Sequence, residues 1–112
     1  MTDVPLLDDD RLAELTDDLG SDDLALVLAM FLQEAEAEAE RLAVGLAEAD
    51  HMKAGHFLRS GALNLGLIGL SHAARRAEIV PVDERPGAVA QIAGLVAATR
   101  HALGPRAVSE VA

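Results

Sequence analysis

Hydrophobic residues recur at helical spacing through the middle of the chain. When successive residues are turned by about 100°, the apolar positions of residues 21–49 fall within about 100° of arc, which is the width of a stripe that packs on one core. This stripe consists of Leu24, Leu28, Phe31, Leu32, Ala35, Ala39, Leu42 and Leu46. Ser21 is placed to cap the segment, Asp22 and Asp23 follow in its first turn, and no proline interrupts it. We therefore predict one long helix from Ser21 to about Ala49.

A shorter amphipathic segment precedes this helix. It carries Leu12, Leu15 and Leu19 on one face and ends at Gly20, because glycine is favoured just past a helix C-terminus. Pro5 and a run of three aspartates stand before it. We predict a short first helix in this position.

Three further helices are predicted in the second half of the chain, at residues 50–65, 67–79 and 88–103. Asp50 is the expected N-cap of the first of them, and Gly66 ends it. Pro81 ends the next helix, and a loop containing Pro86 covers residues 82–87. The apolar positions of the last two helices are Leu67, Leu70, Ala74, Ala77, Val89, Ile92, Ala93, Val96 and Leu103.

The order of these segments predicts an all-α fold. Four amphipathic helices joined by short connections favour an antiparallel up-down four-helix bundle, with the short first helix capping one end. No internal repeat, linker or second domain is visible, so residues 1–112 are expected to form a single domain. Residues 1–7 and 105–112 have no amphipathic pattern, and frayed ends are expected there.

Composition and charge exclude several classes of function. The chain has no cysteine, which excludes disulfides, thiolate metal sites and a cysteine nucleophile. The formal net charge of −10 argues against nucleic acid and against an anionic membrane surface as partners. No apolar run approaches the roughly 20 residues that span a bilayer, and the acidic N-terminus is unlike a signal peptide. We therefore expect a cytoplasmic protein.

One histidine of the third predicted helix points away from its core face. On a helical wheel the apolar side of residues 50–65 lies almost opposite His56. Lys53 and Arg59 stand on either side of the imidazole, and the face beneath it holds Met52, Ser60 and Leu63. No acidic residue occurs between Asp50 and Glu78, so this face is expected to be locally positive in an acidic chain.

An exposed imidazole between two cations suits attack on a phosphoryl group. Imidazole is mostly neutral near pH 7, so one ring nitrogen can act as a nucleophile. Arg59 can form charge-assisted hydrogen bonds to a phosphoryl group, Lys53 can add a point charge, and the small Ser60 leaves room for a partner. The simpler interpretation is that His56 is an ordinary surface residue. We assign that role to His72 and His101, and we expect His51 to be a partly buried packing or capping residue.

The residues from His56 to Gly66 resemble the sequence signature of a known protein family. The run His-Phe-Leu-Arg-Ser-Gly-Ala-Leu-Asn-Leu-Gly resembles the signature of histidine-containing phosphotransfer (HPt) domains, which has Leu two positions after the histidine and Lys or Arg three positions after it. The helix layout is also similar to that family in outline, including Leu70 and the run Arg75-Arg76-Ala77-Glu78. The sequence departs from the signature at Ser60, where glycine is usual, and at Leu63, which is bulkier than the small residue often found there.

The resemblance implies a phosphocarrier rather than a turnover enzyme. His56 would accept a phosphoryl group and exchange it with the aspartate of response-regulator receiver domains, with a histidine kinase as a further partner. Arg59 would stabilise the phosphoryl charge, and Ser60 would be the small docking position. No cofactor or metal of its own is implied, since the receiver supplies Mg²⁺. Because the chain is short and starts at Met1, we expect a free-standing, monomeric relay protein.

Two alternatives remain. In the first, the same bundle is an adaptor that docks receiver domains or kinases and is never phosphorylated. In the second, Glu48 and His51 form one Glu-x-x-His motif of a carboxylate-bridged metal bundle. That pattern needs a second such motif and two further inward glutamates, which the sequence lacks.

Overall fold

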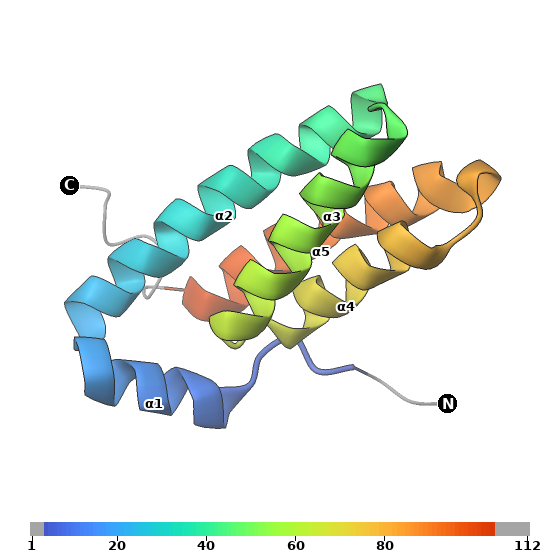
Figure 1. Cartoon of the computed structure of the whole chain (residues 1–112). Helices are drawn as coiled ribbons and strands as arrows, with labels where there is room; N and C mark the ends of the chain where they lie inside the picture. The colour runs from blue at the N-terminus through green and yellow to red at the C-terminus, as the bar shows by residue number, and fades with distance from the viewer. Residues whose placement is uncertain (1–3, 105–112) are drawn as a thin grey trace.

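The predicted helical stripes correspond to five α-helices and one turn of 3₁₀ helix in the computed structural model, which describes residues 4–104 (Figure 1). The elements are α1 (Asp9–Leu19), α2 (Ser21–Val44), α3 (Glu48–Asn64), α4 (Ile68–Ile79), η1 (Val82–Glu84) and α5 (Arg85–Leu103). The described part of the chain contains no β-strand. The all-α prediction is therefore confirmed over these residues.

The apolar stripe of α2 forms one wall of a single core. Its stripe residues from Leu24 to Leu42 are buried as predicted, and Leu46 packs partly buried against the same core from the segment that follows. Helix α2 packs against α1, α3 and α5, while α4 lies between α3 and α5. The largest apolar side chains that are fully enclosed are Leu28, Leu32, Leu58, Leu67, Leu70 and Ile92. Burying a leucine or isoleucine contributes about 1.5–3 kcal/mol, so these six residues supply much of the driving force for packing.

The segment before α1 is tied to the turn between α3 and α4. The backbone N–H of Asp8 donates to the Gly66 carbonyl at 2.8 Å, and the N–H of Gly69 donates to the Leu6 carbonyl at 3.2 Å. Leu6 and Leu7 are partly buried, in contrast with the frayed end expected from the sequence. Frayed ends were also expected at residues 1–3 and 105–112, which lie outside the described residues.

Two helix boundaries in the first half of the chain differ from the prediction. Helix α2 ends at Val44 rather than near residue 49, because Gly45 takes a φ of +105°, a conformation that side chains disfavour. Helix α3 then begins at Glu48, with Ala47 at its N-cap instead of Asp50. The N-cap of α2 is Gly20, so Ser21 is the first helical residue and does not cap the helix.

The connection before α5 is also more helical than predicted. The expected loop at residues 82–87 contains η1, and α5 starts at Arg85. Pro86 lies in the first turn of α5, where a missing N–H costs no hydrogen bond. Two residues that were predicted to lie on apolar stripes, Leu19 of α1 and Ala93 of α5, are exposed. Thr99 of α5, which was not on the predicted stripe, is fully buried.

None of the helices within residues 4–104 combines the length and the apolar character needed to cross a bilayer.

Candidate functional site

His56 lies on the exposed side of α3, as the helical wheel predicted. Ala54, Leu58 and Ala62 of the same helix are buried in the core, which fixes the opposite face toward solvent. His56 is exposed on that face, while Met52 and Ser60 are half-buried. The packing of its apolar side against the core therefore fixes helix α3, and with it the position of the imidazole.

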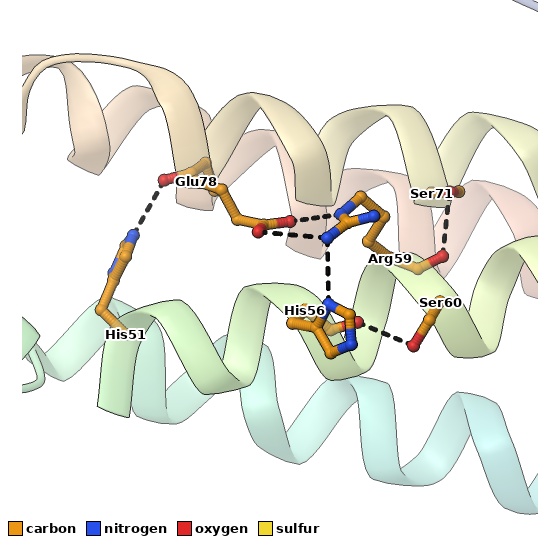
Figure 2. A network of polar contacts seen from close by, with 7 residues as sticks. His51, His56, Arg59, Ser60, Ser71 and Glu78 are labelled. Atoms are coloured by element: carbon orange, nitrogen blue, oxygen red, sulfur yellow. Dashed lines mark hydrogen bonds and ion pairs between the residues drawn. The ribbon is translucent and has the colours of Figure 1, made fainter. Parts of the chain in front are cut away.

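Arg59 is hydrogen-bonded to the imidazole. It lies one turn after His56, and its Nη2 is 2.9 Å from Nδ1 of the ring (Figure 2). An arginine side chain only donates hydrogen bonds, so Nδ1 accepts this one. Arg59 therefore stands beside His56, where the helical wheel places it, and it is also hydrogen-bonded to the ring.

Glu78 of α4 completes this contact from the other side. Its Oε2 accepts a hydrogen bond from Arg59 Nε at 2.6 Å, and its Oε1 is 3.5 Å from Arg59 Nη2 (Figure 2). The hydrogen bond and the charge of Glu78 together raise the pKa of Arg59, so the guanidinium stays protonated. Glu78 is the first acidic residue after Asp50 in the sequence, and the fold brings it next to the site. The expected local excess of positive charge is partly neutralised.

Lys53 and Ser60, the other two polar residues expected near the imidazole, lie in different surroundings from each other. Lys53 is exposed and borders a shallow cavity beside Glu38 and Asp50, on the flank of α3 that faces α2. It forms no ion pair with another described residue. The Ser60 hydroxyl donates to the backbone carbonyl of His56 at 2.9 Å. Ser60 is therefore held against the helix backbone and adds little bulk beside the ring.

Apolar side chains border the exposed face of α3. The ring of Phe57 is partly exposed and lies 5.8 Å, centroid to centroid, from the Phe31 ring of α2. Leu63 is 58% exposed, so the larger residue at this departure from the HPt signature faces solvent. These side chains offer a partner apolar contact on the same helix as His56.

His51 is buried and has a structural role, where the sequence predicts a partly buried packing or capping residue. Its Nε2 lies 2.8 Å from the carbonyl oxygen of Ala77, near the end of α4. The fourth residue after Ala77 is Pro81, which has no N–H to offer that carbonyl. The imidazole therefore donates the hydrogen bond that the chain itself cannot supply. His72 and His101 are exposed.

The Glu-x-x-His pair is engaged with protein groups. Both carboxylate oxygens of Glu48 accept from Arg85, at 2.8 and 3.0 Å, and this hydrogen bonding lowers the pKa of Glu48. His51 is bound to Ala77 as described above. Residues 4–104 contain no group of three or more histidine, aspartate or glutamate side chains arranged to hold a metal ion.

Glu78 belongs to the site but is not among the residues predicted from the sequence. It lies 19 residues from Arg59 and on a different helix, so no local spacing connects the two. The only signal in the sequence was its position at the end of the long acid-free stretch.

Comparisons with models of known protein families, with curated proteins and with solved structures find no match for this chain.

Proposed function

We propose that this protein is a histidine phosphotransfer protein of a two-component phosphorelay, with His56 as the phosphoryl acceptor. The observation that carries the proposal is the solvent-exposed imidazole with a guanidinium hydrogen-bonded to it at 2.9 Å. The resemblance of residues 56–66 to the HPt signature supports the same assignment. The partners are response-regulator receiver domains and a histidine kinase.

The transfer needs few groups from this chain. An unprotonated ring nitrogen attacks the phosphorus of an aspartyl phosphate, and a nitrogen–phosphorus bond forms. The oxygen–phosphorus bond breaks and leaves its electron pair on the aspartate carboxylate, and the reverse sequence returns the group. Because the transition state of phosphoryl transfer is loose, positioning and electrostatics carry the catalysis. Arg59 offers hydrogen bonds to the phosphoryl oxygens, and the receiver supplies the aspartate and Mg²⁺.

The finer architecture is part of the proposal. We assign α2, α3, α4 and α5 to an antiparallel up-down four-helix bundle with α1 as a cap. The contacts of α2 with α3, α3 with α4, α4 with α5 and α5 with α2 support this assignment, since they close a ring of four helices. A closed ring can complete its core within one chain, so we expect a monomer. A cytoplasmic location fits receiver domains and kinases as partners.

Docking is expected on the exposed face of α3. Ser60 takes the position where the HPt signature has glycine, and its side chain is held back by the bond to the His56 carbonyl. Leu63 is exposed on this helix and enlarges its apolar surface. These two departures are expected to restrict which receivers bind without blocking the imidazole.

Transfer from a labelled receiver tests the proposal. Each receiver domain of the source organism is phosphorylated with ³²P and mixed with the wild-type chain, His56→Gln or the matched control His72→Gln. We expect wild type and His72→Gln to take up label that acid removes and base does not, as for phosphohistidine. Uptake by His56→Gln, or an acid-stable label, would contradict the assignment to His56. Receiver binding without any transfer would favour the unphosphorylated adaptor.

A further inference from the structure

The guanidinium of Arg59 lies between two acceptors that come from different helices. On one side it is bound by the Glu78 carboxylate of α4, and on the other it donates to His56 Nδ1 of α3 (Figure 2). Arg59 is about one-third exposed, and the Glu78 side chain is only 11% exposed. In this series of contacts the Glu78 carboxylate is therefore the group shielded from solvent, and the His56 imidazole is the group exposed to it.

This contact decides where the ring hydrogen of the neutral imidazole is. Because the guanidinium can only donate, Nδ1 must hold a lone pair, and the hydrogen of the neutral ring is then on Nε2. This tautomer follows from the donor and acceptor assignments of the network. In this arrangement Nε2 has no free lone pair, and the lone pair of Nδ1 is occupied by Arg59.

We infer that Glu78 is a positioning residue that acts through Arg59 to hold His56 in this closed state. Neither ring nitrogen can attack a phosphoryl group until Arg59 leaves Nδ1. When it leaves, water removes the hydrogen from Nε2 and delivers another to Nδ1, so the ring stays neutral and Nε2 gains a free lone pair. This last consequence rests on the proposed phosphotransfer function, whereas the tautomer itself does not.

The position of Glu78 is built into the contact between α3 and α4. A Cβ atom at Gly55 would lie 2.7 Å from Cγ of Glu78, so the glycine leaves the space through which this side chain passes. Two hydrogen bonds between the helices flank the pair. His51 binds the carbonyl of Ala77, and the Ser71 hydroxyl donates to the carbonyl of Arg59 at 2.9 Å. The carboxylate therefore has a fixed place from which to hold the guanidinium.

Arg59 also has the means to respond to an incoming phosphoryl group. Its Nη1 makes no hydrogen bond to any of residues 4–104, which leaves two N–H donors open. A phosphoryl group with roughly −1.5 to −2 charges can bind these donors and compete with Nδ1 for the guanidinium. The phosphorylated partner would then open the site that it uses.

The tautomer of His56 can be measured directly by imidazole ¹⁵N NMR. The full chain is studied at about pH 8.5, well above the ordinary imidazole pKa of about 6.5, so that a neutral ring is observed. A neutral histidine side chain without such a contact favours the Nε2–H form and also populates the Nδ1–H form, so we expect the wild-type protein to lack that Nδ1–H fraction. An Nδ1–H fraction as large as that of a free histidine side chain, or larger, would overturn the inference, and this measurement needs no variant.

Two variants separate the roles of the side chains. Arg59→Met removes the donor, and Glu78→Met removes the carboxylate that holds it; both should raise the Nδ1–H population. Glu48→Met, which removes the acid of another ion pair on α3, is the matched control and should leave the tautomer unchanged. An unchanged tautomer in Glu78→Met would overturn the role of Glu78. An unchanged tautomer in Arg59→Met would overturn the contact itself.

Failure of this inference can be distinguished from failure of the proposed function. If His56 takes label from a receiver but shows the Nδ1–H form at rest, the closed state is wrong and phosphotransfer stands. If the Nε2–H form and its dependence on Glu78 are found but no receiver transfers label, the phosphotransfer proposal fails.

Discussion

Gly61 of α3 packs directly against the ring of Phe31 on α2. A Cβ atom at position 61 would lie 2.5 Å from the Cε1 atom of that ring, closer than real side chains approach. The same ring is buried in the core and contacts Phe57, which comes from the turn of α3 that follows His56. The small residue at position 61 therefore sets how closely α3 can lie on α2.

Gly61→Ala is expected to destabilise the protein. In a helix interior, alanine is favoured over glycine by roughly 1 kcal/mol, so a gain would be predicted from helix propensity alone. The contact with Phe31 reverses this, because overpacking a core costs about 1–3 kcal/mol. Urea denaturation monitored by circular dichroism measures the difference.

Gly94→Ala is the matched control for that substitution. Gly94 lies inside α5 and is exposed, and apart from its chain neighbours and the adjacent backbone of α5 no atom of the described residues lies within 4 Å of the position that a Cβ would take. This variant should gain up to about 1 kcal/mol. Equal effects of the two substitutions would show that the Phe31 contact does not limit the approach of α3 to α2.

His51→Phe is expected to cost about 1–3 kcal/mol of unfolding free energy. The aromatic side chain keeps most of the buried volume but cannot donate to the Ala77 carbonyl, which Pro81 also leaves without a partner. The exposed His72 provides a comparison, since His72→Phe should change stability by less than about 0.5 kcal/mol. Thermal and urea unfolding of both variants would test this, and similar stabilities would mean that the buried bond contributes nothing.

Thr99→Val is expected to stabilise the protein by about 1 kcal/mol. Thr99 is fully buried in α5, and its hydroxyl has no hydrogen-bond partner among the described residues. Replacing an unsatisfied buried hydroxyl by a methyl group of similar shape removes its desolvation cost. Ser71→Ala should do the opposite, because the Ser71 hydroxyl donates to the Arg59 carbonyl. A loss of stability in Thr99→Val would indicate a partner for that hydroxyl.

The ion pair between Glu48 and Arg85 should contribute to stability in a pH-dependent way. The hydrogen bonds from Arg85 lower the pKa of Glu48 below its ordinary value of 4.5. The pair therefore stabilises the folded state above pH 4.5, and this contribution is lost as the pH falls through the lower pKa of the folded protein. Glu48→Gln should be less stable than wild type at neutral pH.

Comparing Glu48→Gln with wild type separates the contribution of the Glu48–Arg85 pair from that of the other acidic residues. The difference in unfolding free energy between wild type and Glu48→Gln is measured at neutral pH and again below pH 4. We expect a small difference at neutral pH, since both partners reach solvent, and a smaller one in acid. A difference that grows in acid would contradict the assignment.

The sequence was sufficient to predict which face of α3 carries His56. The buried residues Ala54, Leu58 and Ala62 recur at helical spacing, and in a helix that packs on one side the position opposite them faces solvent. The position of Arg59 beside His56 followed from the same period, because residues one turn apart are neighbours on a helix, whereas the hydrogen bond between them was not predicted.

The sequence could not predict the carboxylate behind Arg59. Glu78 reaches the site only because α4 crosses α3 where Gly55 leaves room, and the packing of two helices is not encoded in either one alone. The early end of α2 was missed for a related reason. Most neighbours of Gly45 are alanines and leucines that favour helix, so its positive φ was visible only in the folded chain.

Locating the phosphoryl group on the chain tests the central proposal most directly. After incubation with a phosphorylated receiver, the protein is digested and analysed by tandem mass spectrometry at neutral to alkaline pH, which preserves phosphohistidine. We predict phosphoryl on the peptide that contains residue 56, carried by His56. Phosphoryl found on Ser60, on another histidine, or on no residue of this chain with any receiver tested would contradict the proposal.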